Sequence, residues 1–310
     1  MKAVLLGTGS PPPNPKRRGP STLLSLGDER FLVDAGSGVG AQLVQAGVRP
    51  YDWPRLFITH HHSDHVIDLG HLLITRWIVG QNSPLEVWGP AGTRRQVDKL
   101  LDYLHWDIEV RRAHMIERRP PVVAVTEIEE GRVMEAGGVT VSAFLVEHDP
   151  VKPAFGYRFD GGGRSVVISG DTRPCENLMR WSQGVDCLIH ECCEMAKTAW
   201  YPGCGWPTLE EKIRDLASYH TQPEDLGPGG RGRARQEAGR HAPDAGLRAG
   251  RAGDGRAPAL CRSAGGGERS ARGLAAEGGE HFLRPRLVER RRRGVDDPAD
   301  DPRVTFRLLG

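Results

Sequence analysis

The sequence has no long hydrophobic run and no excess of charge of one sign. None of its apolar stretches approaches the roughly 18 residues that a membrane-spanning helix needs. The apolar stretch in the N-terminal segment MKAVLLGTGSPPP is too short for a signal peptide. Lysine and arginine number 42 against 40 aspartates and glutamates, a net charge of +2. This balance indicates neither a nucleic-acid nor a membrane partner, and we expect no membrane association.

Cysteine is scarce and unevenly placed. All six cysteines lie between positions 175 and 261, and no two of them have CxxC spacing. This pattern lacks the regular framework of small disulfide-rich secreted proteins. We therefore expect a reduced, cytoplasmic protein.

The composition changes near residue 227. Before that point, short apolar or β-branched runs alternate with helical stretches, which predicts a layered α/β domain over residues 1–227. The expected strands are 3–6, 30–33, 56–59, 139–146, 165–169 and 187–189, and the expected helices are 65–80, 91–104 and 208–218. Thr208 with Glu211 three residues later has the pattern of a capping box.

Residues 228–280 contain no valine, isoleucine, lysine, phenylalanine, tyrosine or tryptophan, and glycine, alanine and arginine dominate. Such a segment buries too little apolar surface to offset its ordering entropy, so residues 228–310 are predicted to form a disordered, low-complexity tail. The other interpretation, which we favour over a natural tail, is a slipped reading frame. From Gly229 on, suitable codons read one base over encode VAEAGHVRKLVVTHLMP, a helix and a strand that ends in Thr-His.

A cluster of metal-binding residue types follows the apolar run 56–58. The segment THHHSDH at 59–65 holds four histidines and one aspartate. His60 and His62 are two residues apart, so both can face one ion from an extended loop, and Asp64 and His65 can face a second. Imidazole nitrogens with a carboxylate suit zinc or a similar divalent metal.

Further motifs occur in a fixed order along the chain. They are LGTGSPPPNPKRRGPS at 6–21, FLVDAGSG at 31–38, VEHDPVKPAFGYRFD at 146–160, SGDTRPCENL at 169–178, HECC at 190–193 and HTQPEDLG at 220–227. With these motifs, residues 1–227 resemble the metallo-β-lactamase-fold hydrolases, within them the ribonuclease Z-like branch that also holds alkaline-type arylsulfatases. The resemblance implies an αββα sandwich with the metals at the loop edges between its two sheets.

The resemblance also implies a dinuclear zinc site, with Mn²⁺ or Fe²⁺ as alternatives in one position. Its implied ligands are His60, His62 and His148 for the first ion, Asp64 and His65 for the second, and Asp171 as a bridge between them.

Four further roles follow from the resemblance. Asp34 buttresses the histidine loop, and Asp64 doubles as the base that deprotonates the attacking water. His220 helps to protonate the leaving group, and Glu191 is its pairing carboxylate. Such a pair would keep His220 charged near neutral pH. Taken alone, His220 also fits an ordinary histidine at a helix C-terminus.

The sequence departs from the family pattern in three places. The family's last zinc-binding histidine follows a strand beyond residue 227, whereas here no strand pattern precedes His241 or His281. We therefore expect a fold that lacks its regular C-terminal strand and helix. Only 22 residues separate His148 from Asp171, too few for a tRNA-gripping arm. The segment 200–206 adds three aromatics, either as a packed loop or as the wall of a pocket for an aryl group or base.

The favoured function is a ribonuclease Z-like phosphodiesterase and endoribonuclease of the tRNA 3′-processing type. One alternative is an arylsulfatase or broad small-ester hydrolase acting on an aryl ester, which the missing arm favours. Another is an inactive product of a frameshifted gene. A homodimer is expected from the resemblance alone.

Overall fold

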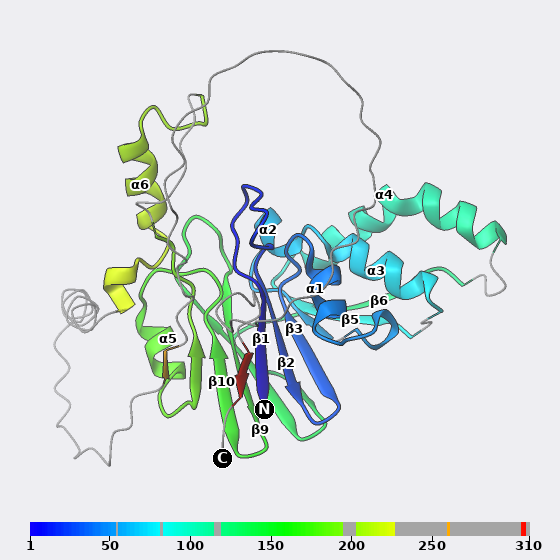
Figure 1. The fold of residues 1–310 in the computed structure, drawn as a ribbon, viewed down its shortest axis with the longest axis horizontal. Coiled ribbons are helices and arrows are strands. Elements are labelled where there is room, and N and C mark those ends of the chain that lie inside the picture. The colour runs from blue at the N-terminus through cyan, green and yellow to red at the C-terminus, as the bar shows by residue number, and fades with distance from the viewer. Residues whose placement is uncertain are drawn as a thin grey trace, which may run out of the picture.

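A computed structural model describes residues 1–53, 55–80, 83–114, 119–194, 203–226, 259–260 and 305–307. Two β-sheets lie face to face, and helices cover their outer faces (Figure 1). This is the predicted αββα sandwich. The predicted tail, residues 228–310, lies outside the described residues except for two short strands, and so does the predicted domain boundary at 227.

The first sheet has the order β13-β1-β2-β3-β4-β5-β6. Its strands are β1 (Lys2–Gly7), β2 (Ser21–Leu26), β3 (Glu29–Val33), β4 (Arg55–Phe57), β5 (Leu85–Gly89), β6 (Val123–Glu127) and β13 (Thr305–Arg307). Strands β3 to β6 are parallel, so their carboxyl ends meet at one edge.

The second sheet has the order β12-β11-β10-β9-β8-β7. Its strands are β7 (Gly131–Ala136), β8 (Val139–Leu145), β9 (Phe155–Gly161), β10 (Arg164–Ile168), β11 (Cys187–Ile189) and β12 (Ala259–Leu260). Strands β9 and β10 form a hairpin that occupies the chain between β8 and the loop of Asp171.

Helices lie outside the sheets and at their upper edge in the view of Figure 1. They are α1 (Val39–Gln45), α2 (Ser63–Val66), α3 (Leu69–Ile78), α4 (Thr93–His114), α5 (Glu176–Trp181) and α6 (Leu209–Ala217), with 3-10 turns η1 (Pro50–Asp52) and η3 (Pro223–Leu226). None of the helices in the described residues is long and apolar enough to cross a membrane.

The core between the sheets contains a cluster of aromatic side chains among its aliphatic ones. Phe57 stacks on Trp88 at 5.1 Å between ring centroids and meets Tyr157 and Phe159 edge to face. The buried Tyr157 hydroxyl donates a hydrogen bond to the carbonyl of Ile58 at 2.7 Å. Because Ile58 immediately precedes the histidine segment, this bond ties that segment to the opposite sheet.

Two predicted helices differ from those observed. The predicted helix 65–80 is divided into α2 and α3, because the backbone N–H of Asp68 donates to the carbonyl of Ala35 and its carboxylate accepts from the N–H of Gly38 at 2.6 Å. The predicted helix 91–104 continues as α4 to His114, over a segment with ion pairs such as Asp107–Arg111 that stabilise helices locally. Helix α6 begins with the predicted capping box.

The described chain beyond η3 consists of two short strands. Strand β12 pairs with β11 in parallel orientation, and β13 pairs with β1 in antiparallel orientation. They are two and three residues long, and no helix follows η3 among the described residues. The chain between and beyond these strands lies outside the described residues, so the expected lack of a regular C-terminal strand and helix stays a prediction.

Gly170, at the turn before Asp171, offers a test of the loop geometry. Its φ is +63°, and an added Cβ would lie 2.6 Å from the carbonyl oxygen of Phe155. We expect Gly170→Ala to destabilise the fold by clearly more than the roughly 1–2 kcal/mol of a left-handed alanine alone. Gly163→Ala is the matched control, since its φ is +69° with no atom within 4 Å. Equal losses in urea unfolding of the two variants would contradict this prediction.

Candidate metal centre

The carboxyl ends of β3, β4, β8 and β10 come together at one edge of the sandwich. Asp34 directly follows β3, the segment 59–65 follows β4, His148 follows β8, and Asp171 follows β10. Segments that lie far apart in the sequence therefore place their polar side chains around one point.

Three histidine nitrogens and one carboxylate form a first group. Nδ1 of His62 lies 3.0 Å from Nε2 of His60 and 3.2 Å from Nε2 of His148. A carboxylate oxygen of Asp171 lies 3.9 Å from Nε2 of His60. Ligands of a tetrahedral zinc ion, bound at about 2.0–2.1 Å, are about 3.4 Å apart. The donor set and its spacing therefore fit one divalent metal ion.

A second group shares the Asp171 carboxylate. Its Oδ2 lies 3.2 Å from Nε2 of His65, and an oxygen of Asp64 lies 3.8 Å from the same nitrogen. Nε2 of His65 is buried and makes no hydrogen bond of good geometry. A buried nitrogen between two carboxylates fits a second cation, with three donors among the described residues.

Burial keeps the histidines of the first group neutral. It lowers the pKa of His60 to about 2 and that of His148 to about 4, and it also lowers the pKa of His62. Burial also opposes ionisation of Asp171, but the charges of the nearby histidines, His65 first, outweigh it and lower the pKa of its carboxyl group. Neutral imidazoles and an ionised carboxylate are the states in which these groups bind metal.

Hydrogen bonds fix the ring orientation of the predicted ligands. Nδ1 of His148 donates to the carbonyl of Tyr219 at 3.0 Å, which leaves Nε2 facing the group. Nδ1 of His65 donates to Asp34 at 2.7 Å. Asp34 also accepts bonds from the backbone N–H and hydroxyl of Thr59. The sequence motifs gave Thr59 no role, although a hydroxyl residue directly before the first histidine was a usable signal.

His220 and Glu191 lie together beside the first group. Nδ1 of His220 lies 2.9 Å from Oε1 of Glu191, which also accepts bonds from the backbone N–H groups of Thr172 and Thr221. Burial raises the pKa of Glu191 to about 7. Burial opposes a charge on His220, but Glu191 outweighs it and raises the pKa of the imidazole.

Ligand atoms of Asp171, Glu191 and His220 also approach one another within 4.8 Å. The three hydrogen bonds to Oε1 of Glu191 already occupy the oxygen that faces His220. The arrangement therefore suits a hydrogen-bonded acid–base pair better than a cation site.

His61 faces away from both groups. Its Nε2 lies 2.9 Å from the hydroxyl of Thr93, and this hydroxyl donates to the carbonyl of Pro90. His241, His281, Trp200 and Tyr201 lie outside the described residues.

Trp206 is the described aromatic of the predicted 200–206 segment. Its indole N–H donates to Asp215 of α6 at 3.0 Å, and Lys212 of the same helix lies over its ring. The ring thus packs on α6.

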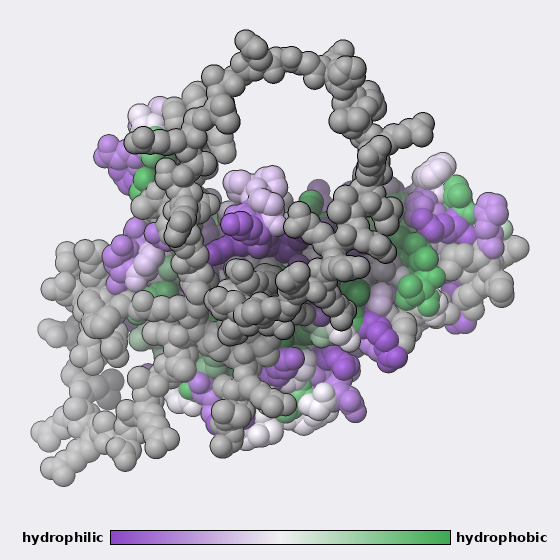
Figure 2. Space-filling model, in the orientation of Figure 1, coloured by the Kyte–Doolittle hydropathy of each residue, from purple (hydrophilic) through white to green (hydrophobic). Residues whose placement is uncertain are grey.

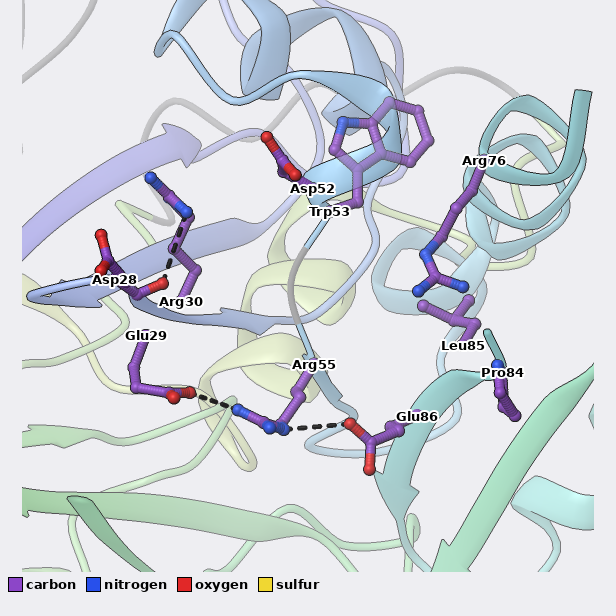
Figure 3. A pocket seen from close by; sticks show the side chains of 10 residues that line it. All are labelled: Asp28, Glu29, Arg30, Asp52, Trp53, Arg55, Arg76, Pro84, Leu85 and Glu86. Atoms are coloured by element: carbon purple, nitrogen blue, oxygen red, sulfur yellow. Dashed lines mark hydrogen bonds and ion pairs between the residues drawn. The ribbon is translucent and has the colours of Figure 1, made fainter. Parts of the chain in front are cut away.

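A hollow of about 200 Å³ lies at the opposite ends of β3, β4 and β5 (Figure 3). Arg55 crosses its floor between Glu29 and Glu86. Its lining residues include no histidine or cysteine, so we assign the candidate site to the histidine cluster instead.

Comparisons with known proteins agree with this geometry. The family described as "Beta-lactamase superfamily domain" matches residues 29–225. Ribonuclease Z of Mycobacterium sp. (strain KMS) is 38% identical over 228 residues, which are 73% of this chain and 78% of that protein. Ribonuclease Z of Mycobacterium avium (strain 104) is 40% identical over 228 residues, 72% and 79% of the two chains.

Two solved structures share the fold. The short form of human tRNase Z is 23% identical with a TM-score of 0.50, covering 72% of this chain and 93% of that one. The metallo-β-lactamase fold protein YhfI from Bacillus subtilis is 19% identical with a TM-score of 0.51, covering 76% and 92%.

Proposed function

Because this chain belongs to the ribonuclease Z family of the β-lactamase superfamily, we propose that it is a metal-dependent phosphodiesterase that cleaves RNA in the manner of tRNA 3′ processing. The observation that carries this proposal is the convergence of His60, His62, His148 and Asp171 on one point beside a paired His220 and Glu191. Members of this family are hydrolytic enzymes.

We propose zinc in two positions, with Mn²⁺ or Fe²⁺ as alternatives in one of them. The first ion would be held by His60, His62 and His148, the second by Asp64 and His65, with Asp171 between the two. Bound divalent ions supply a water of lowered pKa and neutralise charge that develops on the substrate.

The chain's own residues then divide the proton transfers. Asp64, beside His65, would orient the attacking water and accept its proton. His220 directs Nδ1 to Glu191, so its proton for the leaving oxygen would reside on Nε2. Glu191 holds the ring in that orientation. Asp34 supports the histidines from behind.

The composition of the loop between β1 and β2 favours an anionic substrate. Lys16, Arg17 and Arg18 are exposed on it, and hydrophilic side chains gather in its region in Figure 2. The N–H of Gly19 donates to the carbonyl of Ser37 at 3.0 Å, which fixes the loop to the turn that follows Asp34. Exposed cations on this loop would attract phosphodiester oxygens.

One observation favours small esters as a second candidate substrate class. The 22 residues between His148 and Asp171 hold only the β9–β10 hairpin, which leaves no room there for an RNA-gripping arm. An arylsulfatase or broad small-ester hydrolase therefore remains the alternative function.

The purified full chain, loaded with zinc, tests the proposal on three substrates. They are a pre-tRNA with a 3′ extension, bis(p-nitrophenyl) phosphate and an aryl sulfate. Cleavage of both phosphodiesters supports the proposed function. Turnover of the aryl sulfate alone would favour the alternative. A chain that retains no zinc after loading and cleaves none of the three substrates would indicate the inactive, frameshifted product.

Substitution of His220 should separate poor leaving groups from good ones. We expect His220→Gln to slow RNA cleavage by about 100- to 10,000-fold, the range of a lost general acid. Hydrolysis of bis(p-nitrophenyl) phosphate should change far less, because p-nitrophenolate leaves without a proton. His71→Gln is the control, since His71 is exposed on α3. Equal losses on both substrates would contradict the acid role of His220.

The location and assembly are also proposals. We propose a cytoplasmic location, in line with the reduced cysteines expected from the sequence, and a homodimer, in line with the family resemblance. The molar mass of the full chain, measured by light scattering after size-exclusion chromatography, tests the dimer.

A further inference from the structure

Thr59 is buried at the end of β4, where three segments meet. Its side chain is about 1% exposed, and its carbonyl accepts a hydrogen bond from the N–H of Phe155 at 2.9 Å. A Cβ at Gly170 would lie 3.1 Å from the Cβ of Thr59, so this side chain also packs against the turn that leads to Asp171. The proposed function assigns Thr59 no role, although it donates hydrogen bonds to Asp34.

The Thr59 hydroxyl has one proton, and its neighbours decide where that proton goes. Oγ1 lies 2.9 and 3.1 Å from the two carboxylate oxygens of Asp34, which can only accept. The hydroxyl therefore donates to Asp34. Nδ1 of His60 lies 3.0 Å from the same Oγ1, so it must donate in turn. This leaves the lone pair of His60 on Nε2, the nitrogen that faces His62.

Asp34 thus reaches one histidine of each metal group. It accepts directly from Nδ1 of His65 at 2.7 Å and reaches His60 through the Thr59 hydroxyl. Asp34 has a φ of +64°, a left-handed conformation that costs a non-glycine residue energy. The bond from the backbone N–H of Thr59 to Oδ1 of Asp34, at 2.8 Å, holds the carboxylate in this position.

We infer that Thr59 is a positioning residue whose hydroxyl relays the orientation of Asp34 to His60 and so sets the metal affinity of the first group. The inference rests on the proposed function, because it requires that this group binds a divalent ion. Hydrogen-bond partners of metal-binding histidines typically change metal affinity by about 10- to 100-fold.

Two substitutions separate the hydroxyl from the shape of the side chain. Thr59→Val keeps the branched shape that packs on Gly170, and Thr59→Ser keeps the hydroxyl. Zn²⁺ affinity of the full chain is measured by competition with a chromophoric chelator, in a titration that resolves successive ions. We expect Thr59→Val to lower the affinity for the first Zn²⁺ ion by about 10- to 100-fold and Thr59→Ser to keep wild-type affinity.

A ring-nitrogen NMR spectrum of the wild-type, metal-free protein gives a second measurement that needs no variant. It should show His60 protonated at Nδ1. Wild-type affinity in Thr59→Val, an equal loss in Thr59→Ser, or a His60 protonated at Nε2 would each overturn the inference. Should the wild-type chain bind no zinc at all, the proposed function itself would fail, which is a distinguishable result.

Discussion

His62→Ala is expected to abolish hydrolysis and to remove the ion of the first group. Nδ1 of His62 lies 3.0 and 3.2 Å from the facing nitrogens of His60 and His148, so the substitution removes the donor nitrogen between them. Loss of a hydrogen-bond partner of a ligand lowers metal affinity by up to roughly 100-fold, and loss of a ligand itself should lower it further. Elemental analysis of the desalted variant and its turnover of bis(p-nitrophenyl) phosphate measure both effects.

His61→Ala is the matched control for this variant. His61 neighbours His62 in the sequence, but its ring bonds to the Thr93 hydroxyl and lies outside both groups. We expect it to keep the metal content of the wild type. Normal metal content and turnover in His62→Ala would refute the ligand assignment.

Asp171→Asn is expected to impair both groups at once. The carboxylate lies 3.2 Å from Nε2 of His65 and 3.9 Å from Nε2 of His60, so its charge would serve both proposed ions. An amide of the same shape removes that charge. We expect loss of bound metal at both positions and a fall in turnover of more than about 100-fold. This exceeds the effect of removing a hydrogen-bond partner of a ligand.

Asp160→Asn makes the same chemical change at a partly exposed ion pair with Arg158 on β9. An exposed pair of this kind contributes little to stability, so this control should retain its metal. If Asp171→Asn lost only one of two ions, Asp171 would belong to one group and would not bridge them.

The sequence predicts best where the chemistry is local. The THHHSDH segment supplies its donors within seven residues, and its apolar lead-in predicts the strand that carries them. The capping box at Thr208 was predictable for the same reason, because both of its hydrogen bonds span three residues. The layered α/β class likewise follows from runs of apolar residues alone.

Local patterns fail where distant residues interrupt an element. The helical periodicity of 65–80 continues without a break in the sequence, yet Ala35 and Gly38 bond to Asp68 and divide it. No residue pattern within the segment predicts these partners, which lie about thirty residues earlier in the sequence.

The assembly of the site depends on contacts across the two sheets. His148 lies 86 residues from His62 in the sequence, and His220 lies 29 residues from Glu191. Resemblance to a family named these residues in advance, but spacing could not. The place of Thr59 before His60 is visible in the sequence, but its bond to Asp34 is not, because that bond requires the turn after β3 to lie beside the end of β4.

The sequence by itself thus determined the donor types, the layered α/β class and the local caps, since each depends on neighbours within a few residues. The tertiary structure alone decided which nitrogen of His148 and of His65 faces the proposed metal positions. That choice depends on what the other ring nitrogen bonds to: the carbonyl of Tyr219 for His148 and the carboxylate of Asp34 for His65. Those partners are brought into reach only by the packing of one sheet on the other.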